Sequence, residues 1–179
     1  MKLIKILLLP LVFSLAFSGT VLAQDALWVY GKDWSFMVSE PAGWTGITSD
    51  VNKYQVNLYF PMAGYDINSS PVLMYVRVLE KNGNTVKKSL EFDMLDYSQR
   101  KKRIEFLEFP VGTLNYDYAS KKYLINQDQV DYLCYIDPAP ASPYYVIMIL
   151  TGPKGECDNY LDNFLYLVRS FKWLKVTVQ

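Results

Sequence analysis

The stretch "YYVIMILTGPKGECDNYLDNFLYLVRSF", residues 144–171, contains the pattern on which the fold assignment depends. Residues 144–151 are apolar at odd and even positions alike, which predicts a strand that is covered on both faces. The "GPKGE" that follows predicts a turn. From Cys157 to Phe171 the apolar side chains recur at helical spacing, and Asp158 suits the N-cap. The stretch therefore predicts a buried strand, a turn and an amphipathic helix.

Outside this stretch, most of the chain alternates between apolar and polar side chains with a period of two, which predicts strands. One segment, 72–79, is apolar on both faces apart from Arg77, which predicts a second covered strand. Between the strands, residues 86 to about 103 show helical spacing, with Thr85 as a suitable N-cap. The other extended segments are predicted at 26–30, 34–40, 54–60, 104–109, 113–120, 121–127 and 130–137.

The predicted order is strands, helix, strands, helix, with short turns between successive strands. Such an order indicates an α+β fold with a mainly antiparallel central sheet. The two strands that are apolar on both faces predict that helices cover both sides of that sheet. No repeat or low-complexity linker divides residues 24–179, so a single domain is expected over this range.

Residues 1–23 have the pattern of a secretory signal peptide. Lys2 and Lys5 form a positive start, an apolar run follows, and Val21-Leu22-Ala23 supplies small residues for cleavage before Gln24. The apolar run is short for a membrane span, which needs roughly 20 residues. The sequence therefore predicts export to the periplasm or the medium, with no stable membrane insertion after cleavage.

The charge balance argues against nucleic acid as a partner. Lys and Arg number 18, and Asp and Glu also number 18. Removal of Lys2 and Lys5 with the signal peptide leaves 16 basic and 18 acidic side chains, a net charge of −2. Nucleic-acid-binding proteins normally carry an excess of basic side chains.

The chain contains no histidine, which excludes several kinds of chemistry. Ser-His-Asp and Cys-His triads need an imidazole, and so do histidine-based zinc or iron sites. Two cysteines are too few for a four-thiolate zinc site. No pair of carboxylates converges in the predicted elements to act as acid and base. We therefore expect a protein that is not an enzyme, with no cofactor and no metal.

Three features together resemble the Mog1/PsbP-like family. The first is an early strand that ends in Pro-x-Gly-Trp, here "FMVSEPAGW", residues 36–44. The second is a mid-chain helix followed by successive strands, and the third is "YYVIMILTG" leading into a helix that ends "FLYLVRSFKW", residues 164–173. The resemblance extends to the small exported bacterial members related to the DcrB group. It implies a three-layer α/β/α sandwich around an antiparallel sheet.

What the resemblance implies for function is limited, because members of the family do unrelated things. One branch binds a small GTPase, one is an extrinsic subunit of photosystem II, and the bacterial members are envelope proteins. No catalytic residue is common to the family. The resemblance implies a protein-interaction module whose partner is an envelope protein, and fold analogy alone does not name that partner.

Cys134 and Cys157 leave two interpretations open. Exported compartments permit disulfides, so the two residues could form a bond that closes a loop of 22 intervening residues. Alternatively they are two separate buried thiols. The sequence does not decide between the two.

Two groups of side chains are candidates for an interaction surface. One is the basic run Arg100, Lys101, Lys102 and Arg103, whose alternative role is a solvated helix end that favours the helix dipole. The other consists of tyrosines near predicted loops, a residue type that often anchors protein contacts, although half-exposed sheet tyrosines are common. These tyrosines are Tyr118, Tyr123, Tyr144 and Tyr145.

The sequence therefore predicts an exported, non-catalytic interaction module of the cell envelope. The alternative is a carrier of a small apolar, lipid-like ligand, held in a cleft between the sheet and a helix. A cavity of several hundred Å³ lined by apolar groups would favour the carrier, because such cavities are typical of small-ligand sites.

Overall fold

The computed structural model describes residues 26–48, 55–100 and 103–174. The predicted signal peptide lies outside these residues. The larger of two sheets has seven strands in the order β3-β4-β5-β9-β8-β7-β6, and every neighbouring pair is antiparallel. Its strands are β3 Ile47–Thr48, β4 Leu58–Pro61, β5 Leu73–Glu80, β6 Ile104–Leu107, β7 Asp117–Ile125, β8 Gln129–Asp137 and β9 Tyr144–Pro153.

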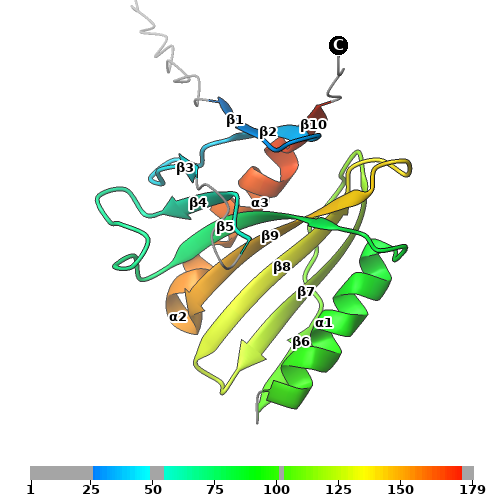
Figure 1. The fold of residues 1–179 in the computed structure, drawn as a ribbon. Helices are drawn as coiled ribbons and strands as arrows, with labels where there is room; N and C mark the ends of the chain where they lie inside the picture. Colours follow the sequence, from blue (N-terminus) through cyan, green and yellow to red (C-terminus); the bar gives the residue numbers. More distant parts are fainter. Residues whose placement is uncertain (1–25, 49–54, 101–102, 175–179) are drawn as a thin grey trace, which may run out of the picture.

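A smaller sheet of three strands joins the two ends of the described chain. It consists of β1 Ala26–Tyr30, β2 Ser35–Ser39 and β10 Lys172–Leu174, with β2 in the centre. Both pairs are antiparallel. Figure 1 shows this sheet at one end of the molecule, beside α3 Leu161–Ser170.

Helix α1, Val86–Arg100, begins where the sequence predicts. The Thr85 hydroxyl accepts a hydrogen bond from the amide of Lys88 at 3.3 Å, so the predicted N-cap is confirmed. The capping contact satisfies one of the amides that a helix start leaves without an intrahelical partner.

The predicted continuous helix over 157–171 is instead divided into three parts. They are α2 Lys154–Cys157, the 3-10 helix η1 Asp158–Tyr160, and α3. Asp158 is not an N-cap. Its Oδ1 accepts hydrogen bonds from the Tyr132 hydroxyl at 2.5 Å and from Lys122 Nζ at 2.9 Å, so the carboxylate is directed at the sheet.

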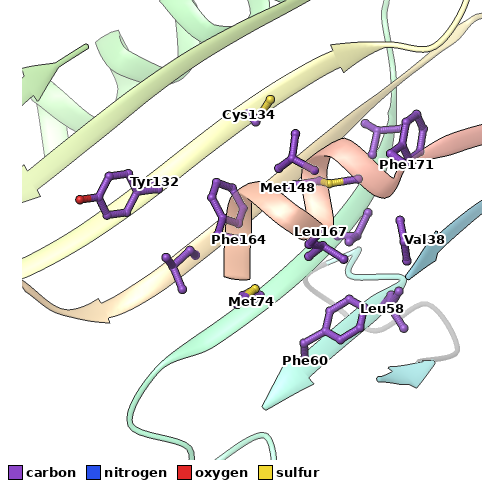
Figure 2. Packing of buried hydrophobic residues seen from close by; sticks show 14 of the residues in the cluster. Val38, Leu58, Phe60, Met74, Tyr132, Cys134, Met148, Phe164, Leu167 and Phe171 are labelled. Atoms are coloured by element: carbon purple, nitrogen blue, oxygen red, sulfur yellow. The ribbon is translucent and has the colours of Figure 1, made fainter. Parts of the chain in front are cut away.

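The two faces of the large sheet support two separate cores. On one face, α3 and the small sheet pack over β4, β5, β8 and β9, and Figure 2 shows Phe164 and Leu167 of α3 among strand side chains such as Met74 and Met148. Phe36 of β2 meets Phe171 there, with ring centroids 5.8 Å apart. On the other face, α1 packs over β6, β7 and β8. The predicted α+β class with an antiparallel sheet is confirmed.

The prediction that β5 is covered on both faces is wrong. Burial alternates along the strand: Met74, Val76 and Val78 are buried against the α3 side, whereas the side chains between them are only half-buried. By contrast, β9 is buried on both faces over residues 146–150. The difference arises because β5 lies nearer the edge of the sheet, beyond the part that α1 covers.

No helix in the described ranges has the length and apolar character required to cross a lipid bilayer.

Candidate binding groove

A single helix cannot cover one face of a sheet this wide. Seven strands at a spacing of about 4.8 Å span roughly 29 Å, whereas an α-helix with its side chains is about 10 Å across. Helix α1 lies over the β6–β8 half of its face, as Figure 1 shows. Within the described residues, α1 therefore does not extend over the β4–β5 half of that face.

The first hollow on this half of the face has a volume of about 520 Å³. The register places Tyr59 of β4 directly opposite Tyr75 of β5, and their ring centroids are 6.4 Å apart. Both rings line the hollow, and so does Arg77, the next residue of β5 on the same face. The remaining lining residues are Gln55, Val56, Ile67 and Leu73.

A second hollow, of about 590 Å³, adjoins the first at Gln55. It lies where β9 begins and is lined by Trp34, Tyr144 and Tyr145, together with the polar Asn57 and Glu80. The two hollows together are called the tyrosine groove below. It is defined by Trp34, Gln55, Tyr59, Tyr75, Arg77, Tyr144 and Tyr145.

The chain before β4 forms the ridge between the two hollows. The Asn57 amide donates to the Val76 carbonyl at 2.9 Å, and the Asn57 side-chain oxygen accepts from the Val78 amide at 2.7 Å. These bonds hold the segment beside β5, although regular pairing begins only at Leu58. Gln55 has a positive φ of 55°, which turns the chain at the point where the two hollows meet.

Arg77 is the electrostatic feature of the first hollow. Of the described residues that line it, Arg77 alone carries a charge. Its Nε atom is buried and has no hydrogen-bond partner among the described residues. A buried polar group without a partner is costly, and more so when the group is charged. The guanidinium is therefore suited to an acidic group from outside the described residues.

Asp131 of β8 lies on the same face, two strands away from β5. Its carboxylate is buried and accepts hydrogen bonds from the Thr151 hydroxyl at 2.6 Å and from the Tyr97 hydroxyl at 3.5 Å. Burial, and then the Asp131 charge, raise the pKa of Tyr75. The Tyr75 phenol therefore stays neutral at physiological pH.

Tyrosines also fill the space beneath α1. The Tyr123 hydroxyl donates to Asp93 of α1 at 3.2 Å, and its ring contacts those of Tyr97 and Phe106 edge-on at 5.0 and 4.8 Å. Burial, and then Asp93, raise the pKa of Tyr123 and of Tyr135. These contacts attach α1 to the β6–β8 half of the sheet.

The structure separates the four predicted surface tyrosines. Tyr144 and Tyr145 line the second hollow, where the Tyr144 hydroxyl donates to Asp33 at 2.8 Å. Tyr123 is fully buried beneath α1, so its assignment to a surface is corrected. Tyr118 is 38% exposed on β7, outside the groove, and its hydroxyl donates to the Gly112 carbonyl at 3.0 Å.

The two described arginines of the basic run do not line the groove. Arg100 forms an ion pair with Asp96 and lies over the Tyr97 ring at 5.7 Å. Arg103 lines a separate, smaller hollow of about 190 Å³ beside β6. Lys101 and Lys102 lie outside the described residues. For the two described arginines, the structure therefore favours the alternative interpretation of a solvated helix end.

Cys134 and Cys157 are separate buried free thiols, so the disulfide interpretation is corrected. The Cys157 sulfur lies next to Gly152, which pairs with Val130 at the start of β8. Cys134 is four residues farther along the same strand, roughly 13 Å away at 3.3 Å per residue. A disulfide requires Cα atoms closer than about 7 Å. Burial raises the pKa of Cys157 to about 12, so its thiol is protonated and unreactive.

Sequence reasoning missed Tyr59, Tyr75 and Arg77 as site residues. The available signal was Arg77, a charge in an otherwise apolar strand, because a charged residue is rarely buried without a partner. In the sequence, nothing distinguishes Tyr59 and Tyr75 from other strand residues. In the described parts of the chain, no group of three or more Cys, Asp or Glu side chains is placed to hold a metal ion.

Comparison with known proteins finds similarity among solved structures. No family model matches the chain, and no curated protein matches it. Among solved structures, the chain is similar to the solution structure of cyanobacterial PsbP (CyanoP) from Synechocystis sp. PCC 6803, with a TM-score of 0.49 and 15% sequence identity. The match covers 89% of this chain and 99% of the other.

Proposed function

We propose that this chain is an exported, non-catalytic binding protein of the cell envelope, and that the tyrosine groove is its docking surface for a partner protein. The observation that carries the proposal is the pair of adjoining hollows. Tyr59, Tyr75 and Arg77 line the first, and Trp34, Tyr144 and Tyr145 line the second, which reaches both faces of the sheet at the start of β9. Tyr, Trp and Arg are the residue types that contribute most to binding energy at protein interfaces.

We also propose that the chain is a Mog1/PsbP-like protein with the three-layer α/β/α arrangement. The support comes from the "FMVSEPAGW" and "YYVIMILTG" segments and from the position of α1 and α3 on opposite faces of the large sheet. The small sheet lies beside α3 and completes the cover on that side. Export from the cell is part of the same proposal and is supported by the predicted signal peptide.

The docking proposal is tested with paired tyrosine variants. Combined Tyr75→Ala and Tyr145→Ala substitutions remove two rings from the groove, whereas Tyr118→Ala with Tyr166→Ala removes two exposed rings outside it. After crosslinking in the native envelope, the groove pair is expected to reduce recovery of the partner at least tenfold, and the control pair is expected to leave it unchanged. Equal recovery with both pairs, at equal protein level, would reject the groove as the docking surface.

A second candidate function is the binding of a small apolar ligand, which the volume and lining of the first hollow favour. The position of this hollow differs from the cleft between the sheet and a helix that is expected from the sequence. In the described part of the chain, Phe164 and Leu167 of α3 are fully buried against the sheet, and the hollow lies over β4 and β5 on the opposite face. Native mass spectrometry of the protein from its own envelope tests this function. Bound small molecules are expected, and an unliganded mass alone would argue against it.

A further inference from the structure

We propose that the first hollow binds a small organic carboxylate with an apolar body, and that the carboxylate pairs with Arg77. This inference rests on the second candidate function, because it names the ligand class for that hollow. In this proposal, the Arg77 guanidinium binds the charged carboxylate, and the apolar walls of the hollow contact the body of the ligand.

The walls of the hollow are suited to hydrocarbon. Val56, Ile67 and Leu73 supply aliphatic surface, and the rings of Tyr59 and Tyr75 supply aromatic surface. The volume of about 520 Å³ falls within the range of roughly 300–1,000 Å³ that is typical of small-molecule sites. Each methylene buried there is expected to strengthen binding about fourfold.

Arg77 supplies the charge complementarity. No acidic residue is present among the described residues that line the hollow, and the buried Nε of Arg77 has no hydrogen-bond partner among them. A guanidinium presents its N–H groups in a planar fork that matches the two oxygens of a carboxylate. A carboxylate placed on this fork supplies the acceptor that the described residues do not.

The surrounding charges favour a single negative charge over a double one. One arginine neutralises one carboxylate. Asp131 lies on the same sheet face, and its charge reaches Tyr75, which is a wall of the hollow. A phosphate monoester carries a charge of about −1.5 to −2, whereas the described lining of the hollow supplies one cation, Arg77. A monoanionic carboxylate is therefore the better match.

The test compares decanoate with 1-decanol, which has the same chain length and no charge, by isothermal titration calorimetry on the full chain freed of co-purified ligand. Decanoate is expected to bind at least tenfold more tightly than decanol. Arg77→Gln is expected to weaken decanoate binding about tenfold, because it removes a charge-assisted hydrogen bond, and to leave decanol binding unchanged. Arg103→Gln, a control outside this hollow, is expected to change neither affinity.

Two further variants keep the test decisive if Arg77→Gln fails to fold. Arg77→Lys retains the charge without the planar fork and is expected to weaken decanoate binding severalfold. Leu73→Trp fills the hollow and is expected to abolish binding of both probes. Equal affinity for decanoate and decanol would overturn the inference and leave the apolar site in place. Failure of both probes to bind would overturn the inference and the second candidate function together, whereas docking of a partner is measured independently by crosslinking.

Discussion

Trp34 shows how a single residue of the groove is held in place. Its ring lines the second hollow and stacks on Phe36 and Trp173, with centroid distances of 5.9 and 6.4 Å. Gly31 precedes it in a tight turn, in which the Gly31 amide donates to the Trp34 carbonyl at 2.8 Å. A Cβ atom at Gly31 would lie 2.1 Å from the Trp34 ring, so the position requires glycine for steric reasons.

Gly31→Ala is therefore expected to displace the Trp34 ring and to lower the free energy of unfolding by about 1–3 kcal/mol. Urea unfolding followed by tryptophan fluorescence measures the change. Gly155→Ala is the matched control, because no atom lies within 4 Å of its added Cβ and the residue is in α2. The control is expected to be neutral or slightly stabilising. Equal stability of the two variants would contradict the packing described for Trp34.

The buried tyrosines predict a dependence of stability on alkaline pH. The pKa values of Tyr75, Tyr97, Tyr123 and Tyr135 are raised in the folded chain, in each case first by burial and then by Asp131 or Asp93. In the unfolded chain these phenols ionise near pH 10. Their contribution to stability is therefore fully present below about pH 10 and is lost as the pH rises above it.

Spectrophotometric titration of the phenols, with urea unfolding at pH 8 to 11, measures this dependence. Part of the 15 tyrosines is expected to remain neutral above pH 11 in the folded protein, whereas all titrate together in urea. The free energy of unfolding is expected to fall above pH 10. If all phenols of the folded protein titrate near pH 10, this result would contradict the placement of these four tyrosines in buried positions.

Tyr123 and Tyr145 show what the sequence can and cannot predict at this scale. The alternation in each strand predicts that neighbouring side chains point to opposite faces, and the structure confirms it. It does not predict which half of a face a distant helix will cover. Tyr123 lies under α1 and is fully buried, whereas Tyr145 contacts Ser89 of α1, is only half-buried and lines the second hollow. Only tertiary packing separates the two.

At the scale of elements, α1 determines which part of the sheet is open. It is held by a short buried row, Val86, Ser89 and Leu90, while Phe92 and Leu95 are exposed on its outer side. The sequence predicted the start of α1 from Thr85, because capping is a local interaction. It did not predict the break between α2 and α3, because Asp158 is bound by Tyr132, which is 26 residues away in the chain.

Two leucines of α1 provide a matched test of this packing. Leu90→Ala is expected to reduce the free energy of unfolding by about 2–5 kcal/mol, because Leu90 is only 4% exposed. Leu95→Ala is expected to change it by less than about 0.5 kcal/mol, because that side chain is 56% exposed. Chemical denaturation measures both. A larger loss at Leu95 than at Leu90 would mean that α1 packs on the sheet through its other face.

At the scale of the whole molecule, the groove follows from a mismatch between the width of the sheet and its cover. Helix α3 and the small sheet together cover one face, whereas α1 is the one helix on the other face in the described ranges and covers about half of it. The order of elements in the sequence was sufficient to predict the antiparallel α+β class. The open half was not predictable, because it depends on the lateral position of α1 and on the segment around Asn57 that borders β5.

The central claim is that the tyrosine groove is the binding surface, and site-specific photocrosslinking in the native envelope tests it most directly. A photoreactive phenylalanine analogue replaces Tyr145 in the groove or, as a control, Tyr166, which is 39% exposed on α3. The account predicts one discrete crosslinked species from position 145 and none from position 166. Crosslinking from position 166 alone, or to the same extent from both positions, would contradict it.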